Sequence, residues 1–197
     1  MIKAIHLELS FAEKLIFKDF SFSIEKGEKV CISGASGKGK STILKMLMAY
    51  VIPNHGEIEI NNLKIKPENI NAIRKQIIWI PQNINLPVNN GKELMDLMQL
   101  SSHKNRVEAL LIELGLEASI LSSDFSQISG GQKQRVIIAI CLSMDKEIIL
   151  MDEPTASLDE DSIDKLISYL SKLKNRTIVS ASHHQRWIKS WDKNIAL

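Results

Sequence analysis

Apolar and polar residues alternate along the first third of the chain. Segments 6–11 (HLELSF), 20–32 (FSFSIEKGEKVCI) and 56–62 (GEIEINN) follow a period of two, which is typical of half-buried antiparallel strands. The end of the second segment, KVCI at 29–32, also has the composition of a buried strand. The pattern therefore predicts a β-rich N-terminal part, with antiparallel strands over these three segments.

Later in the chain, short continuous apolar runs alternate with helical stretches. The runs are 76–80 (QIIWI), 147–151 (EIILM) and 177–182 (TIVSAS). Such alternation is typical of a parallel sheet packed between helices. The clearest helical pattern covers 162–174 and places one apolar set on a single face: Ile163, Leu166, Ile167, Leu170 and Leu173.

Residues from about 88 to 128 contain no strand signal. Two helical patterns lie there, the first formed by Leu94, Leu97 and Met98, the second by Val107, Leu110, Leu111 and Leu114. We interpret this stretch, together with the start of the helix that follows Gln132, as a helical subdomain inserted into a single domain over 1–197, because a chain of 197 residues is long enough for one domain with a modest insertion.

Charge and composition narrow the functional classes. The 25 basic and 23 acidic residues are spread along the chain, so nothing indicates a nucleic-acid partner or a polybasic membrane anchor. Cys31 and Cys141 lie in apolar segments and indicate structural thiols of a reducing compartment. The N-terminus lacks the plan of a signal peptide, and no apolar run approaches a membrane span. We expect a cytoplasmic protein whose membrane role, if it has one, comes through a partner.

A glycine-rich turn follows the KVCI strand. Gly34, four further residues, then Gly39, Lys40 and Ser41 match the phosphate-binding pattern G-x-x-x-x-G-K-[ST]. Glycines let backbone N–H groups point inward, and a helix starting near Lys40 adds its positive end. Lys40 would reach the β- and γ-phosphates, and the Ser41 hydroxyl would hold Mg²⁺. The alternative is a strand-to-helix turn that binds nothing.

Two adjacent carboxylates end the run at 147–151. Asp152 fits the acid that supports Mg²⁺ in phosphate-loop hydrolases, and Glu153 could align or deprotonate a water that attacks the γ-phosphate. Strand C-termini are where α/β sheets place ligands. The alternative is an acidic loop that caps the next helix.

A serine and two glycines precede a strongly apolar helical pattern after residue 132. Serine is a preferred N-cap residue, so Ser129 could simply cap the helix. A helix cap does not require two consecutive glycines such as Gly130 and Gly131. Without side chains, they would let a ligand approach the backbone closely. The serine hydroxyl and the free helix N–H groups could form a second anion site.

With these motifs in place, the chain resembles the ATP-binding cassette (ABC) ATPases over essentially its whole length. The motifs follow the order of that family: the loop Gly34–Ser41, the PQ pair with Gln82, the SGGQ signature Ser129–Gln132, DEP with Asp152 and Glu153, SLD ending in Asp159, and SASH ending in His183. A phosphate-loop kinase or GTPase would have no use for SGGQ.

The resemblance implies a P-loop NTPase fold of class α/β, with a mostly parallel RecA-like sheet, an N-terminal antiparallel β-subdomain and an inserted helical subdomain. It also implies the binding residues. Nucleotide would contact Phe11, Gly34, Ala35, Ser36, Gly37, Lys38, Gly39, Lys40, Ser41 and Thr42, and Mg²⁺ would contact Ser41, Gln82 and Asp152. Phe11 would stack on adenine, although a Phe after a strand can also be a core residue.

The resemblance assigns catalysis to Glu153, His183 and Gln82, with His183 touching both the γ-phosphate and Glu153. The signature residues Ser129, Gly130, Gly131 and Gln132 would bind the γ-phosphate held by another subunit, and Asp159 would lie in the loop that joins the two subunits. The surface at 83–90 would receive a permease.

Lys38 and His184 are among the residues that depart from the family pattern. Lys38 stands where a small residue is usual, so it either adds positive charge beside the phosphates or points to solvent. His184 replaces the usual aspartate after the switch histidine, which leaves the hydrogen bonds of that loop open.

The resemblance implies an ATPase that binds ATP and Mg²⁺ and powers a membrane transporter through ATP-driven dimer closure. The partners would be a separate transmembrane permease and a second copy of the chain or a paralogous cassette, without nucleic acid. The chain would be peripheral on the cytoplasmic face of the membrane. The alternative is a soluble ABC-type ATPase of a cofactor (iron–sulfur) assembly system, which is also a single short cassette.

Overall fold

The computed structural model describes residues 1–12, 14–82 and 87–197. These residues divide into two compact units. The first contains 1–79, 146–153 and 174–197, and the second contains 80–145 and 154–173. The first unit holds an antiparallel and a parallel sheet, and the second is built of helices. The predicted α/β class with an antiparallel β-subdomain is confirmed.

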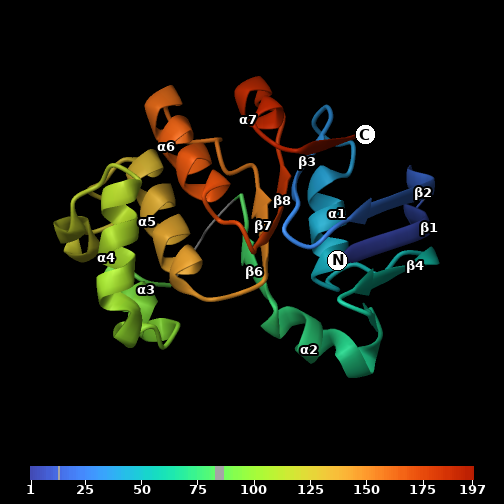
Figure 1. The fold of residues 1–197 in the computed structure, drawn as a ribbon, viewed down its shortest axis with the longest axis horizontal. Helices are drawn as coiled ribbons and strands as arrows, with labels where there is room; N and C mark the ends of the chain where they lie inside the picture. Colours follow the sequence, from blue (N-terminus) through green and yellow to red (C-terminus); the bar gives the residue numbers. More distant parts are fainter. Residues whose placement is uncertain (13, 83–86) are drawn as a thin grey trace. The chain divides into compact units, whose positions relative to one another are not determined.

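The antiparallel sheet has the strand order β2-β1-β4-β5 (Figure 1). Its strands are β1 (Ile2–Phe11), β2 (Lys14–Ile24), β4 (His55–Ile60) and the short β5 (Leu63–Lys64). In β1, Ile2 and Ala4 are buried, and after a register shift between Ala4 and Leu7 the buried positions are Leu7 and Leu9. The predicted period of two therefore corresponds to one buried face at Leu7 and Leu9 in segment 6–11, where Phe11 is exposed, and at Ile58 and Ile60 in segment 56–62.

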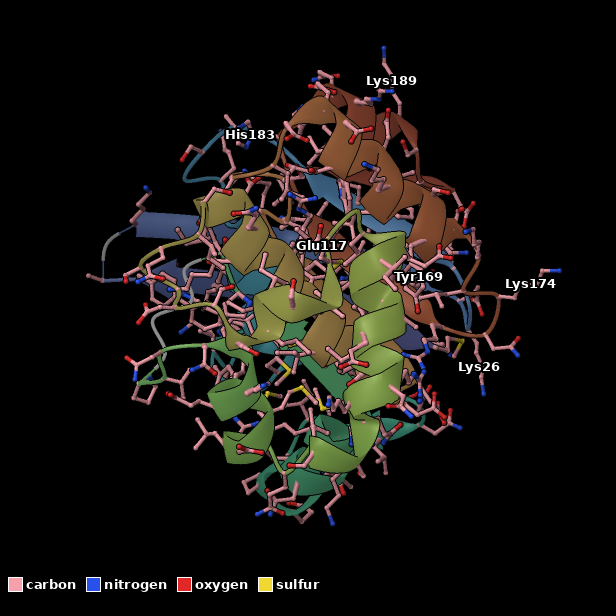
Figure 2. The ribbon with its side chains drawn as sticks, turned by 90° about the vertical axis from the view of Figure 1, so that its left-hand side faces the viewer. Lys26, Glu117, Tyr169, Lys174, His183 and Lys189 are labelled. Carbon is pink, nitrogen blue, oxygen red and sulfur yellow. The ribbon has the colours of Figure 1, made fainter. Side chains whose placement is uncertain are left out.

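The parallel sheet has the order β6-β7-β8-β3-β9 (Figure 1). Its strands are β3 (Lys29–Ser33), β6 (Ile77–Ile80), β7 (Ile148–Asp152), β8 (Thr177–Ala181) and β9 (Lys193–Ala196). The three apolar runs predicted to form a parallel sheet become β6, β7 and β8. The turns before β3 and β8, which carry Lys26 and Lys174, are adjacent (Figure 2), since a Cβ on Gly27 would lie 3.2 Å from the Lys174 carbonyl oxygen.

The antiparallel prediction for 20–32 is wrong over its last part. Lys29–Ser33 forms β3, which pairs in parallel with β8 on one side and β9 on the other. The physical reason is burial on both faces: Val30, Cys31 and Ile32 are fully buried in succession. Consecutive buried residues are typical of an inner parallel strand and not of a half-exposed antiparallel one.

The helices of the first unit are α1 (Lys40–Leu47), α2 (Ile70–Lys75) and α7 (Gln185–Lys189), with a 3₁₀ turn at Pro67–Asn69. Helix α1 starts at Lys40 as predicted and buries Ile43, Leu44 and Leu47. In α7, Trp187 is fully buried, and its indole N–H donates to the Ser180 hydroxyl at 2.9 Å.

The second unit contains α3 (Gly91–Leu97), α4 (Lys104–Glu113), α5 (Gly130–Ser143) and α6 (Glu160–Ser171), with 3₁₀ turns at Ser101–His103 and Ala118–Ser122. Helix α4 lies along α5 (Figure 1), and the Arg135 guanidinium of α5 donates to the Leu114 carbonyl just after α4. The stretch from 88 to 128 thus forms helices, and α5 and α6 belong to the same unit. Within the described residues, no helix combines the length and apolarity needed to cross a bilayer.

Both cysteines are predicted to be chemically inert. Burial raises the pKa of the Cys31 thiol to about 11 and that of Cys141 to about 12, and only the thiolate reacts. In a titration with Ellman's reagent, the native protein should show no fast thiol, even as the pH rises through about 8.5, where an exposed thiol ionises. Both thiols should react once denaturant is added. Fast reaction of either thiol in the native protein would contradict this assignment.

Candidate active site

The register of the parallel strands brings three motifs to one edge of the sheet. Ala181 at the end of β8 pairs with Ile32 of β3 on one side and with Asp152 of β7 on the other. The residues that follow these strands, Gly34, Glu153 and His183, therefore leave the sheet at the same carboxyl edge. This is the edge at which α/β sheets place ligands.

The loop between β3 and α1 takes a backbone conformation that needs glycine. Gly37 and Gly39 have φ values of 78° and 97°, in the region that L-residues avoid. Gly39 is the N-cap of α1, and a Cβ added there would lie 2.6 Å from Cζ of Phe17 in β2. The loop is thus pressed against the antiparallel sheet, and neither glycine is interchangeable with alanine.

Lys40 holds the inside of this loop. Its ammonium is almost fully buried and donates to the carbonyl oxygens of Gly34 at 2.9 Å and Ala35 at 3.3 Å. It also lies 3.5 Å from Oε1 of Glu153. A buried charge requires such partners, because it has lost its hydration. Lys40 therefore ties the start of the loop to the end of β7.

Ser41 and Asp152 form the second contact between the loop and β7. The Ser41 hydroxyl donates to Oδ1 of Asp152 at 2.8 Å. Burial raises the pKa of the Asp152 carboxyl, and the hydrogen bond from Ser41 acts in the opposite direction. A buried carboxyl beside a hydroxyl is an all-oxygen donor pair of the kind that Mg²⁺ prefers, so these residues fit the ion that the sequence pattern implies.

Glu153 is held in an unusual conformation. Its φ is 45°, which is uncommon for a residue with a side chain, and its backbone N–H donates to the Ala181 carbonyl at 2.8 Å. Nδ1 of His183 lies 3.0 Å from both carboxylate oxygens of Glu153. The carboxylate is buried, whereas 71% of the His183 side chain is exposed (Figure 2). The expected contact between His183 and Glu153 is therefore present.

His184 has a structural role at the same loop. Its backbone N–H donates to the Ser182 hydroxyl at 3.1 Å, and its side chain accepts from the Trp187 N–H as the N-cap of α7. The substitution of histidine for aspartate therefore keeps a capping acceptor in place, since neutral imidazole nitrogen can accept a hydrogen bond.

The remaining predicted nucleotide contacts of the first unit lie in the loop, in the first turn of α1 and at the end of β1. Ala35, Ser36 and Lys38 are exposed, and Thr42 is partly buried in the first turn of α1. Phe11 ends β1 with 49% of its surface exposed. This exposure excludes the alternative that Phe11 is a core residue and leaves its ring accessible for stacking.

The signature residues belong to the second unit and start α5. The Ser129 hydroxyl accepts from the Gln132 N–H, and the Gln132 side-chain oxygen accepts from the Ser129 N–H, which together form a capping box. A Cβ on Gly131 would lie 2.5 Å from the Ser157 carbonyl oxygen, whereas one on Gly130 would meet nothing closer than 3.8 Å. Packing therefore requires Gly131, while Gly130 stays open to a ligand.

Asp159 and Gln82 also lie in the second unit. Asp159 is exposed and is the N-cap of α6, and hydrogen bonds from Ser162 lower the pKa of its carboxyl. Gln82 is exposed. Of the surface predicted to receive a permease, 83–86 lies outside the described residues. The structure thus gathers the loop, Asp152, Glu153 and His183 in one unit, and describes Gln82, the signature and Asp159 in the other.

Sequence reasoning missed two residues that shape the site. Ala181 carries the carbonyl oxygen that holds the Glu153 backbone, and Phe17 carries the ring that packs against Gly39. Neither has a chemical signature in the sequence. No local signal marked either residue, because the role of Ala181 depends on the register of adjacent parallel strands and that of Phe17 on packing between sheet and loop.

Comparison with known proteins places this arrangement in a family. Residues 17–156 match the ABC transporter family. The ATP-dependent permease MDL1 of Candida albicans is 36% identical, with 93% of this chain and 29% of the relative covered. The energy-coupling factor transporter ATP-binding protein EcfA2 of Staphylococcus epidermidis is 32% identical, with 84% of this chain and 63% of the relative covered. The chain thus spans less than two thirds of either relative.

A comparison with solved structures indicates the same family. An ATP-binding cassette, solved as a dimer in a post-hydrolysis state bound to ADP and Pi, superposes with a TM-score of 0.87 at 30% identity, covering 100% of this chain and 94% of that one. The chain belongs to the ABC transporter family, and its fold is that of the ATP-binding cassette.

The two glycines of the loop give a matched pair for mutation. Gly37→Ala adds a Cβ that meets nothing within 4 Å, so only backbone strain of about 1 kcal/mol is expected. Gly39→Ala adds the overlap with Phe17 to that strain, so its free energy of unfolding should fall by about 3 kcal/mol. Urea denaturation measures both variants. Equal losses would show that Phe17 does not press on the loop as described.

Proposed function

We propose that this chain binds and hydrolyses ATP and uses the resulting dimer closure and opening to power a membrane transporter. The observation that carries this proposal is the cluster at the carboxyl edge of the parallel sheet. There, the buried lysine of a glycine-rich loop pairs with Glu153, Ser41 donates to Asp152, and His183 contacts Glu153.

Binding would begin at the loop. The backbone N–H groups from Gly34 to Ser41 and the N-terminal end of α1 would face the phosphate chain. Lys40 now donates to two loop carbonyls and faces Glu153, so its ammonium is already positioned inside the loop, where the β- and γ-phosphates would lie. The exposed Phe11 ring would stack on the adenine.

Ser41 and Asp152 would hold Mg²⁺ with help from Gln82. The Ser41 and Asp152 side chains both offer oxygen donors, which Mg²⁺ prefers. Within the described parts of the chain, no three His, Cys, Asp or Glu side chains are placed to bind a metal together. When bound, the ion would neutralise phosphate charge and hold the chain of phosphates in position.

Glu153 and His183 would carry the chemistry. The Glu153 carboxylate would orient the attacking water and accept its proton, a contribution of about 10²–10⁴-fold in rate. Its position is fixed by the backbone bond to Ala181 and by His183 Nδ1 at 3.0 Å. The exposed side of His183 is free to approach the γ-phosphate.

The signature would act on a second subunit. Ser129 is at the N-cap of α5, and Gly130 leaves open space beside the helix N-terminus, a combination suited to binding an anion. The related cassette solved with ADP and Pi is a dimer. We therefore propose that each site is completed by Ser129, Gly130, Gly131 and Gln132 of another copy or of a paralogous cassette, with Asp159 at the joint.

The transporter partner follows from the relatives. Those compared above are a permease and a transporter ATP-binding protein by name, which favours a transport role over the cofactor-assembly alternative. The permease would be a separate membrane chain, with this chain peripheral on the cytoplasmic face.

Replacing the proposed base tests the function directly. Glu153→Gln removes the proton acceptor but keeps the side chain's shape and phosphate binding. With ATP and Mg²⁺, ATP hydrolysis should fall by about 10²-fold or more, while light scattering should show a dimer that persists. The wild-type protein should hydrolyse ATP and return to monomer.

Lys40→Ala serves as the control, because it removes the lysine of the phosphate loop and should abolish ATP-dependent dimerisation. A Glu153→Gln protein that binds ATP yet stays monomeric, in the presence of its partner chain as well, would contradict the proposed closure.

A further inference from the structure

The buried groups of the proposed nucleotide site carry an unfavourable charge balance. Lys40 supplies one positive charge, whereas Asp152 and Glu153 supply two negative charges, and all three side chains are almost fully buried. Glu153 already faces Lys40 at 3.5 Å. Among the charged side chains buried at this edge, the negative ones thus outnumber the positive one, and Lys45 of α1 is a further cation that acts on Asp152. Charges act strongly over several ångströms where water is scarce.

Lys38 is placed to change that balance. It lies in the loop between Gly37 and Gly39, its backbone N–H donates to the Ala35 carbonyl at 3.3 Å, and its side chain is exposed. In the chain outside 13 and 83–86, no carboxylate pairs with its ammonium and no acceptor receives a hydrogen bond from it. Lys40, by contrast, is engaged by two carbonyls and a carboxylate.

We infer that Lys38 supplies the positive charge that offsets Asp152 and Glu153 when a polyphosphate binds, and that it acts most strongly on nucleotide without a metal ion. This inference rests on the proposed function of the same site. The exposed ammonium moves on a flexible four-carbon stem, so it can follow the phosphates without a fixed geometry. Metal-free ATP carries more unneutralised charge than its Mg²⁺ complex, so it gains more from an added cation.

Lys38 stands where the family pattern has a small residue. The loop needs small residues where the backbone turns, and Gly37 and Gly39 already meet that need. A long side chain between them is tolerated because it points outward. What it adds is charge rather than shape, which makes the charge alone the quantity to vary.

The test is calorimetric binding of ATP to the full chain, once with EDTA and once with Mg²⁺. Lys38→Met removes the charge and keeps the length, and Lys38→Arg keeps the charge. Lys75→Met is the matched control, because Lys75 is an exposed lysine at the end of α2, away from the loop. The neighbouring Arg74 donates to the carbonyls of Met48 and Ala49, which lie at the opposite end of α1 from the loop. Thermal unfolding checks that each variant is folded.

Lys38→Met should weaken metal-free ATP about tenfold and the Mg²⁺ complex about threefold. The loss should shrink at high salt, since exposed charges are screened. Lys38→Arg, which keeps the charge, should lose much less affinity than Lys38→Met, and Lys75→Met should bind as the wild type does.

Equal affinities for Lys38→Met and Lys75→Met would overturn the inference and show that the side chain only points to solvent. An equal loss for both forms of ATP would overturn the charge argument. A wild-type chain that binds neither form would instead overturn the proposed function, and the inference with it.

Discussion

The buried ammonium of Lys40 is the interaction on which the site depends. Lys40, Asp152 and Glu153 lie almost wholly out of water, and taking a charge out of water costs several kcal/mol unless partners replace the hydration. Each group has such partners: two loop carbonyls and Glu153 for Lys40, Ser41 for Asp152, and His183 for Glu153. Three segments far apart in the sequence are thereby held at one sheet edge by the same requirement.

Two sets of contacts fix the backbone around these charges. In the parallel sheet, the strand register sets the ends of β7 and β8 next to each other, and the Ala181 carbonyl accepts a hydrogen bond from Glu153, whose φ is positive. In the antiparallel sheet, Phe17 packs against the backbone at Gly39. The β-subdomain therefore supports the phosphate loop in addition to carrying the exposed Phe11. The proposed catalytic residues thus follow strands of the parallel sheet, whereas the antiparallel sheet of the same unit supports the phosphate loop.

In the helical unit, one short motif meets a structural and a chemical need together. The capping box of Ser129 and Gln132 satisfies backbone groups at the start of α5. Gly131 is small because the Ser157 carbonyl approaches it, whereas Gly130 has free space. The helix start and the approach of Ser157 thus explain Ser129, Gln132 and Gly131, and the open space beside Gly130 is what the proposed anion binding would use.

Local composition and short spacing were enough to predict the apolar runs of β6 to β8, the start of α1 at Lys40 and the helical character of 88–128. The roles of the proposed site residues stay predictions. The limits of a single domain over 1–197 stay a prediction. Only the tertiary structure decided that Lys29–Ser33 joins the parallel sheet, that Phe11 is exposed and that Phe17 constrains Gly39. These features depend on contacts between residues that are distant in the chain. Alternation and motif spacing are local patterns, so they cannot reveal the burial and strand register that such contacts create.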